Sequence, residues 1–149
     1  MTNKMEETKN IYKELSKIKL KIKKKGRFDY ASWAECWQEV KKLYPKANYE
    51  VIPFKSKTVK EGVLVETEKL IHPISKEGGG FVKVQVTINE LTHIEYYPIL
   101  NNMNKPIKYD FITAFDVNSS IKRGLVKCLA LFGLGLHIFN GEEFNEENN

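Results

Sequence analysis

Two cations stand four residues apart in a strongly apolar stretch near the C-terminus of the chain. The segment IKRGLVKCLALFGLGLHIF spans residues 121–139 and contains Arg123 and Lys127, with Lys122 beside them. On a helix, side chains four residues apart share a face, so the two positive charges repel each other unless an anion or solvent relieves them. A phosphate would relieve the repulsion, and so would the water around an exposed basic face.

A second group of cations lies in the N-terminal part of the chain. Residues 17–27, KIKLKIKKKGR, hold seven basic residues and no acidic one. Residues 1–60 carry sixteen Lys and Arg against seven Asp and Glu, a net charge of +9, whereas the last ten residues carry four Glu and no base. Such a cluster attracts polyanions through its field and through counterion release, although a solvated surface or a loose arm has the same composition. The candidate phosphate ligands are Arg123, Lys127, Lys122, Lys19, Lys21, Lys23, Lys24, Lys25, Arg27, Lys105 and Lys108.

The motifs of several enzyme classes do not occur in the sequence. It has no G-x-x-x-x-G-K-[ST] loop to cradle a nucleotide, and GLGLHI follows an expected helix and has no third glycine, unlike a dinucleotide fingerprint. The three histidines have no metal-ligand spacing. Four carboxylates could gather a divalent metal as in a nuclease, although turn, cap and tail roles suit them better: Asp110, Asp116, Glu142 and Glu143. We therefore expect a protein that is not an enzyme and that uses no cofactor or metal.

Length and composition predict one globular domain. The 149 residues suffice for a single core, 42% of them are apolar, and no run of about twenty apolar residues is present to cross a membrane. We expect the domain to cover residues 10–141, between a flexible N-terminus (1–9) and an acidic flexible tail (142–149). The first ten residues have no apolar signal core, so we expect a cytoplasmic protein whose Cys36 and Cys128 are reduced thiols.

Two helices are expected in the first third of the chain. One is short and covers residues 11–16. The other begins at a capping box formed by Ser32 and Glu35 and ends at Pro45. An aromatic stripe at helical spacing along this second helix favours packing in a core over the stacking of bases. The stripe consists of Trp33, Trp37, Val40 and Tyr44.

The two cations of the first segment are expected on a long C-terminal helix. Asp116 or Asn118 caps this helix, which runs to about Phe132 and ends at Gly133. Both cations then face away from its apolar side, and this side consists of Val117, Ile121, Leu125, Cys128, Leu129 and Phe132.

Most of the remaining chain has the alternation of β-strands, which makes the expected fold class α+β. The expected strands are KIKLKIK (17–23), NYEVIPF (48–54), GVLVET (62–67), FVKVQVTI (81–88) and THIEYYPIL (92–100). A polar link, Lys55–Glu61, separates the second strand from the third, and SKEGGG (75–80) is expected to be a mobile loop. The last two strands form a hairpin across Asn89–Leu91. Candidate stacking residues are Tyr96, Tyr97 and Tyr109.

Three separated blocks of the sequence resemble a known family. They are YASWAECWQEVKKLYPKANYEV, then FVKVQVTI with YYPIL, and then FDVNSSIKRGLVKCLALFGLGLHIFNGEE. Together they are similar to the phage single-strand annealing proteins of the Sak type, over roughly residues 15–143. A more distant similarity, carried by GLVKCLALFG, connects the chain to the eukaryotic annealing protein called Rad with the number fifty-two. The chain departs from the eukaryotic helix at Val126 and Ala130, where that helix has bases.

The resemblance implies a fold and a function. The fold would be a curved antiparallel sheet, made of β-hairpins, packed against a long C-terminal helix, with a further helix near the N-terminus. The protein would assemble into a ring or helical filament, hold single-stranded DNA in a basic groove, and anneal complementary strands without ATP in phage-type recombination and repair. On the matching helix Arg123 and Lys127 would contact phosphates, and Lys122 is a weaker candidate.

Two other functions stay open at this point. A passive single-stranded DNA coating protein would bind in the same way but hinder pairing, and a metal-dependent nuclease would cleave the strand. The acidic tail would compete with DNA for the basic groove or recruit a recombinase or a host replication protein.

Overall fold

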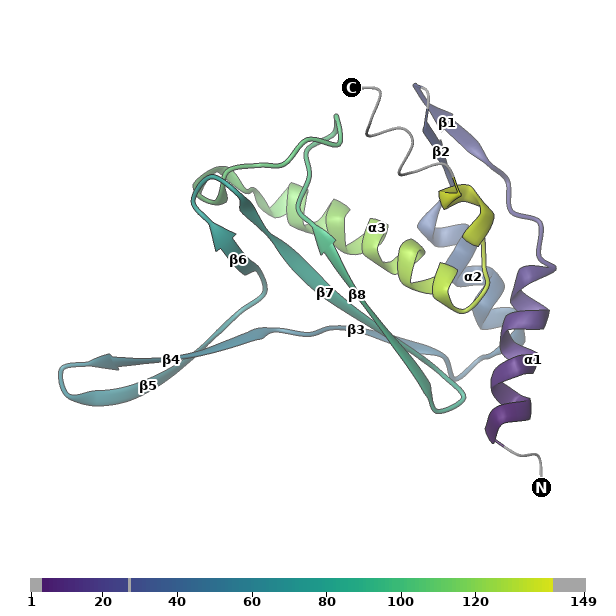
Figure 1. Cartoon of the computed structure of the whole chain (residues 1–149), viewed down its shortest axis with the longest axis horizontal. Helices are drawn as coiled ribbons and strands as arrows, with labels where there is room; N and C mark the ends of the chain where they lie inside the picture. The colour runs from purple at the N-terminus through teal and green to yellow at the C-terminus, as the bar shows by residue number, and fades with distance from the viewer. Residues whose placement is uncertain (1–3, 27, 141–149) are drawn as a thin grey trace. The chain divides into compact units, whose positions relative to one another are not determined.

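The computed structural model describes residues 4–26 and 28–140, and it has the expected α+β fold class (Figure 1). The helices are α1 (Lys4–Ser16), α2 (Trp33–Leu43) and the long α3 (Ala114–Leu131), with short 3-10 helices η1 (Tyr109–Phe111) and η2 (Leu136–Phe139). The strands are β1 (Lys23–Lys25), β2 (Phe28–Tyr30), β3 (Asn48–Val51), β4 (Phe54–Lys60), β5 (Val63–Lys69), β6 (His72–Ser75), β7 (Gly79–Ile88) and β8 (Leu91–Pro98).

The strands form one four-stranded sheet and two separate hairpins. In the larger sheet β7 pairs with β3, β6 and β8, whereas within the described residues β1 pairs only with β2 and β4 only with β5. The turn between β7 and β8 has two residues, Asn89 and Glu90, which have positive φ angles of 47° and 69°. Such angles are those of the turn that matches the twist of a hairpin. The predicted hairpin is therefore confirmed, with a loop one residue shorter than expected.

The chain divides into two compact units. Unit 1 comprises Met1–Asn48, Val86–His93 and Leu125–Asn149, and unit 2 comprises Tyr49–Gln85 and Ile94–Gly124. Strands β3, β7 and β8 and helix α3 contribute residues to both units. Both cysteines belong to unit 1, where they are free and buried, as expected of reduced thiols.

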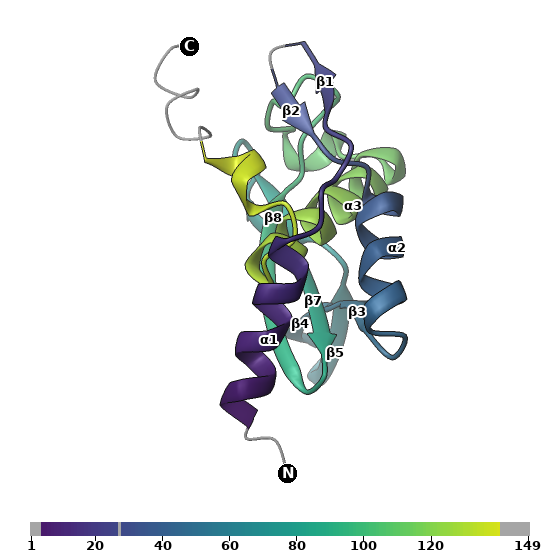
Figure 2. The ribbon, with the colours of Figure 1, turned by 90° about the vertical axis from the view of Figure 1, so that its right-hand side faces the viewer.

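Unit 1 is built on amphipathic helices that bury small sets of aliphatic side chains. Helix α1 buries Ile11 and Leu15, four residues apart, and α2 buries Cys36 and Val40 at the same spacing. Each fully buried aliphatic side chain contributes about 2 kcal/mol. Figure 2 shows how α1 leads through an extended segment to the β1–β2 hairpin. The part of α3 in this unit buries Leu125, Cys128, Leu129 and Ala130, and the turn after it buries Phe132 and Leu134.

The end of α3 is fixed by Gly133, as the sequence predicted. Its φ of 108° suits glycine, and a Cβ atom there would lie 2.8 Å from the carbonyl oxygen of Tyr12 in α1. The Gly133 N–H donates to the carbonyl of Ala130 and the Leu134 N–H to that of Leu129, at 2.9 and 3.2 Å. These two bonds satisfy carbonyls that the helix end would otherwise leave unpaired.

The start of α3 differs from the prediction. Thr113 precedes the helix, and its hydroxyl accepts a hydrogen bond from the Asp116 N–H at 3.2 Å. In return the Asp116 carboxylate accepts hydrogen bonds from the Thr113 N–H and hydroxyl, at 3.0 and 2.8 Å. The cap is therefore Thr113, because the reciprocal pair satisfies donors on both sides of the first turn. Asp116 supports this cap from within the helix.

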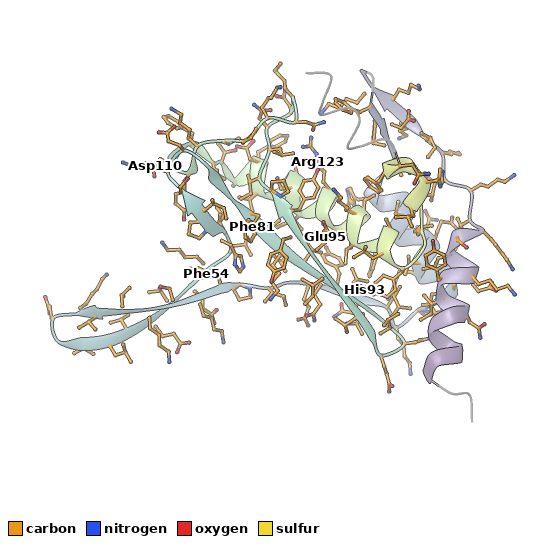
Figure 3. The ribbon with its side chains drawn as sticks, in the orientation of Figure 1. Phe54, Phe81, His93, Glu95, Asp110 and Arg123 are labelled. Atoms are coloured by element: carbon orange, nitrogen blue, oxygen red, sulfur yellow. The ribbon has the colours of Figure 1, made fainter. Side chains whose placement is uncertain are left out.

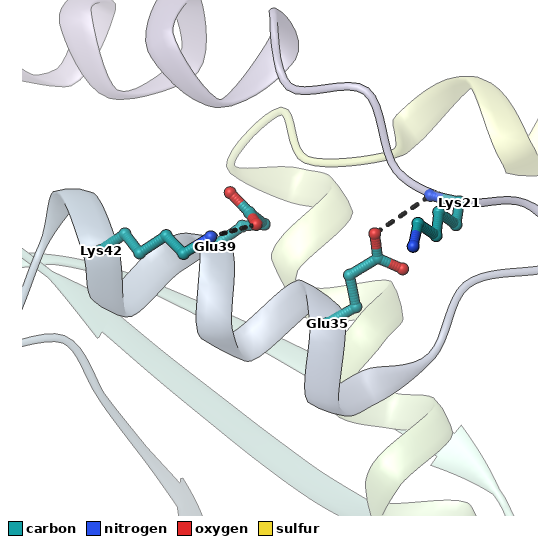
Figure 4. A network of polar contacts seen from close by, with 4 residues as sticks. All are labelled: Lys21, Glu35, Glu39 and Lys42. Atoms are coloured by element: carbon teal, nitrogen blue, oxygen red, sulfur yellow. Dashed lines mark hydrogen bonds and ion pairs between the residues drawn. The ribbon is translucent and has the colours of Figure 1, made fainter.

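The N-terminal predictions need two corrections. KIKLKIK is not a strand: residues 18–22 have no regular structure, and β1 begins only at Lys23. Ser32 is the N-cap of α2, but its side chain makes no capping bond. The Glu35 carboxylate instead accepts a hydrogen bond from the Lys21 N–H at 3.1 Å (Figure 4). The first helix, α1, is longer than the expected segment and begins at Lys4.

The expected polar link, Lys55–Glu61, lies almost wholly in a strand. Strands β4 and β5 pair along their full length, from Phe54 opposite Lys69 to Lys60 opposite Val63, and Glu61 and Gly62 form the turn. The β4–β5 hairpin projects away from the strands β3, β6 and β7 of unit 2 (Figure 1). Residues 76–78 of the expected SKEGGG loop form a turn, while its last two glycines begin β7.

Candidate nucleic-acid interface

Strands β7 and β8 follow an alternation of exposure that gives the sheet two different faces. On β7, Val82 and Val84 are buried, whereas Phe81 and Lys83 between them are partly exposed. On β8, Tyr97 packs toward α3, since a Cβ at Gly124 would lie 3.0 Å from the Tyr97 Cβ atom. Alternate side chains of a strand point to opposite faces. One face of the sheet therefore packs on α3, and the other is open.

Arg123 is held in unit 2 by a loop. Its Nη1 atom donates to the carbonyl oxygen of Asn101 at 3.4 Å, and the side chain is half-buried. The loop closes on itself because the Asn101 side-chain oxygen accepts hydrogen bonds from the N–H groups of Met103 and Lys105, at 2.9 and 3.1 Å. The structure thus brings two predicted phosphate ligands, Arg123 and Lys105, to the same loop. Arg123 is therefore partly buried on its helix, a degree of burial that its spacing did not predict.

The other candidates of unit 2 have partners. Lys122 is half-buried, and its ammonium donates to the Tyr49 hydroxyl at 3.1 Å. Lys108 forms an ion pair with Glu77 at 3.2 Å, although both side chains are mostly exposed. An exposed pair of this kind contributes little to stability, so a phosphate competes readily for the lysine.

The candidates of unit 1 fall into two groups. Lys127 is half-buried on α3, with its ammonium 5.7 Å from the centroid of the Phe139 ring. The lysines before α2 are exposed, and Lys24 pairs with Asp29 at 3.6 Å across the β1–β2 hairpin. These exposed lysines are Lys19, Lys21, Lys23, Lys24 and Lys25. Arg27 and the acidic tail, 142–149, lie outside the described residues.

The candidate stacking residues separate into different environments. Tyr96 is on the open face of the sheet with 52% of its surface exposed, whereas Tyr97 faces α3. Tyr109 begins η1, and its N–H donates to the Lys76 carbonyl at 3.0 Å. In the predicted stripe of α2, Val40 is buried as expected, but Trp33 is 40% exposed.

A family comparison decides the relationship of the chain. The family described as Sak Single Strand Annealing Protein matches residues 9–149, almost the whole sequence. The chain belongs to this Sak family. Within the comparisons made, no curated protein and no solved structure matches it. The resemblance seen in the three sequence blocks is thereby confirmed.

Of the four carboxylates that could serve a nuclease, the structure of this Sak-family chain describes two, Asp110 and Asp116. Asp116 is engaged by Thr113 in the cap of α3, and Asp110 lies in η1. Among residues 4–26 and 28–140, no group of three His, Cys, Asp or Glu side chains is placed to hold a metal ion. Glu142 and Glu143 are outside these residues. In the same part of the chain, no helix is long and apolar enough to span a membrane.

Sequence reasoning missed an aromatic cluster on the open face of the Sak-family sheet. Phe54, His72 and Phe81 join Tyr96 there, and Figure 3 labels Phe54 and Phe81. Phe81, which is partly exposed, and Tyr96, which is exposed, occupy open-face positions of β7 and β8, which the alternation of both strands indicates. Phe54 and His72 come from segments whose pairing the sequence did not reveal.

Proposed function

We propose that the protein binds single-stranded DNA through its phosphates and promotes the annealing of complementary strands, without ATP and without sequence preference. The observation that carries this proposal is the Sak-family match over residues 9–149. The basic side chains of both units support it, above all Arg123. Two complementary strands repel each other through their phosphates, so a protein that neutralises one backbone lowers the barrier to pairing.

Arg123 is suited to phosphate contact because it is oriented but not neutralised. One of its five N–H donors is taken by the Asn101 carbonyl, and no carboxylate pairs with it among residues 4–26 and 28–140. A guanidinium held in this way has lost part of its rotamer freedom before the ligand arrives. Contacts to phosphate carry no sequence information, so binding by such residues is indifferent to sequence.

Assembly of several copies is part of the proposal. At the tip of the β4–β5 hairpin, Val59 and Leu64 stand opposite each other with 69% and 65% of their surfaces exposed. Unit 2 also has an open pocket of about 400 Å³, almost wholly apolar, lined by Leu70, Ile71, Ala114, Val117, Asn118 and Ile121. The apolar hairpin tip of one copy could enter the apolar pocket of another copy, which supports a head-to-tail contact between copies. Contacts of that type generate rings or helical filaments.

The setting of this activity is also a proposal. Annealing without ATP fits phage-type recombination and repair in the cytoplasm of a host cell, and the four glutamates of residues 142–149 would compete with DNA or recruit a partner protein. Deleting residues 142–149 tests the competition, because affinity for an oligonucleotide should then rise.

The deciding experiment measures the pairing rate of two complementary oligonucleotides, one with a fluorophore and one with a quencher. We expect the protein to accelerate pairing in the presence of EDTA and without nucleotide. The variant R123A/K127A should lose most of the acceleration while keeping its far-UV circular dichroism. The control is Lys42→Ala, which removes one positive charge from an ion pair with Glu39 on α2 and is compared with each single variant, Arg123→Ala and Lys127→Ala, as well as with the double variant (Figure 4).

Each alternative gives a different result in this assay. A passive coating protein binds the oligonucleotides but slows their pairing. A nuclease shortens a labelled strand when magnesium replaces EDTA. Either result would contradict the annealing proposal.

A further inference from the structure

Four aromatic rings meet on the open face of the unit 2 sheet. His72 stacks on Phe81, with ring centroids 5.5 Å apart and planes 11° from parallel, and Phe54 lies 5.2 Å from His72. Tyr96 stands edge-to-face with Phe81 at 5.3 Å and with His72 at 6.3 Å. These separations are those of favourable aromatic pairs, so each ring helps to fix the orientation of its neighbours. The cluster is therefore a stiff platform.

The platform is not enclosed as a hydrophobic core would be. None of its four rings is buried, and Tyr96 is more than half exposed. The valines at the intervening positions of β7, Val82 and Val84, are fully buried on the opposite face. The aromatic side chains thus occupy positions at which a half-solvated sheet ordinarily has polar residues.

A positive charge lies over one ring of the platform. The Lys83 ammonium lies 5.5 Å from the centroid of the Tyr96 ring, and no carboxylate pairs with Lys83 in the described part of the chain. An aromatic surface beside an unneutralised cation matches a nucleotide, which has a flat base and a phosphate at a short fixed distance. A protein partner would have to bury the same ammonium or supply an acid for it.

We propose that Tyr96, supported by Phe81 and His72, is a stacking site for one unpaired nucleobase, and that Lys83 contacts the adjoining phosphate. This inference rests on the proposed function, because it places a base of the bound single strand. Stacking uses the π face of the base and leaves its Watson–Crick edge free. The site is therefore compatible with pairing to a complementary strand, and it tolerates any sequence because every base has a π face.

The test compares two ligands of the same length, oligo-dT and an oligonucleotide whose central nucleotides are abasic. Tyr96→Leu removes the ring while keeping apolar bulk, and Tyr96→Phe keeps the ring. We expect Tyr96→Leu to weaken oligo-dT binding by roughly 5- to 100-fold and to leave binding of the abasic strand within twofold of wild type. Tyr96→Phe should match wild type on both ligands.

The control substitution is Ile94→Ala, two residues away on the same strand, where an exposed side chain is apolar but not aromatic. It should change neither affinity. A 2-aminopurine base in the strand supplies an independent readout, because its fluorescence should be quenched by wild type and by Tyr96→Phe, but not by Tyr96→Leu.

Three outcomes separate the stacking site from the proposed function. Equal oligo-dT affinity for Tyr96→Leu and wild type would overturn the stacking site and leave DNA binding intact. An equal loss on both ligands, with a smaller particle mass, would show that the platform contacts a second copy, which also overturns it. No binding of oligo-dT by wild type would overturn the proposed function itself.

Discussion

The hydroxyl of Thr113 and the carboxylate of Asp116 hold each other across the first turn of α3. The Asp116 carboxylate accepts from the Thr113 hydroxyl at 2.8 Å, and the Thr113 hydroxyl accepts from the Asp116 N–H at 3.2 Å. This pair fixes the start of the helix that positions Lys122, Arg123 and Lys127. It also gives the Asp116 carboxylate a structural role in the helix cap, in place of the metal-binding role that a nuclease would require.

Removing this cap should destabilise the fold. We expect Thr113→Ala and Asp116→Ala each to lower the free energy of unfolding by about 1 kcal/mol, because helix N–H groups then lose their acceptors. Urea unfolding followed by circular dichroism measures the change. Asn118→Ala, on the exposed side of the same helix, should stay within about 0.5 kcal/mol of wild type. A stable Asp116→Ala variant that had lost a magnesium-dependent cleavage activity would contradict this role.

Binding of single strands should depend steeply on salt. Each cation that neutralises a phosphate contributes about −0.7 to the slope of log affinity against log salt, so about five cations give a slope near −3.5. Arg123→Ala should make the slope less steep by about 0.7, whereas Arg123→Lys should preserve it because the charge remains. Fluorescence anisotropy at several salt concentrations provides the slopes, with Lys42→Ala as the control. An unchanged slope in a folded Arg123→Ala variant would remove this residue from the phosphate contacts.

The tip of the β4–β5 hairpin should control assembly. Val59 and Leu64 form an exposed apolar pair, and Leu64→Glu places a charge in this pair. If the pair enters an apolar pocket of another copy, the variant has to bury that charge, which is unfavourable. We expect the variant to give a smaller particle mass than wild type in light scattering, with and without an oligonucleotide. Thr58→Glu adds the same charge to the other face of the hairpin and should leave the mass unchanged. Equal masses for Leu64→Glu and wild type would exclude the tip as the contact.

Stability should fall at mildly acidic pH because of His93. Its ring lies 4.5 Å from that of Phe132, and burial lowers the pKa of the imidazole below its ordinary value of 6.5. The unfolded state therefore binds a proton more readily than the folded state, so this contribution is complete above pH 6.5 and is lost as the pH falls through the lowered pKa. Urea midpoints at pH 7.5 and 5.5 should differ more for wild type than for His93→Gln. A difference of the same size in both proteins would contradict this origin.

The sequence was sufficient where a local rule decides the structure. Gly133 ends α3 because its backbone adopts a positive φ, and the β7–β8 hairpin follows from two alternating runs on either side of a short turn. The capping box at Thr113 obeys the same kind of rule, since threonine is followed three residues later by an acid. The sequence prediction, which places the cap at Asp116 or Asn118, misses this box.

The sequence prediction was wrong where a residue pattern that is typical of one structure occurs in a different one. The alternation of lysines with Ile18, Leu20 and Ile22 imitates a strand, but only Leu20 is buried, next to Gly135, and Ile22 is 41% exposed. Strand β4 shows the opposite error, because Lys55–Glu61 is expected to be a polar link, whereas β5 agrees with the expected strand GVLVET. Strand β4 buries almost nothing, so no hydrophobic period marks it, and its pairing with β5 across the Glu61–Gly62 turn comes from backbone bonds.

The charged residues of the candidate site could be predicted from the sequence, but the contacts that arrange them could not. Arg123 was identified from its helical spacing with Lys127. Its hydrogen bond to the Asn101 carbonyl could not be predicted, because it depends on a loop that is closed by hydrogen bonds to the Asn101 side chain. The aromatic platform depends on the pairing of His72 with Phe81 in β6 and β7. The glycine-rich turn between these strands is marked in the sequence, but β6 is not among the expected strands.

The two cysteines make the protein convenient for labelling. Both are buried, and burial, reinforced by the charge of Glu35, raises the pKa of the Cys36 thiol to about 12, so that this thiol keeps its proton at neutral pH. A cysteine introduced at an exposed position such as Thr58 would react with a maleimide dye far faster than either native thiol. Fluorescence from a dye at that position could then follow the encounter of the protein with a single strand in real time, in an otherwise native sequence.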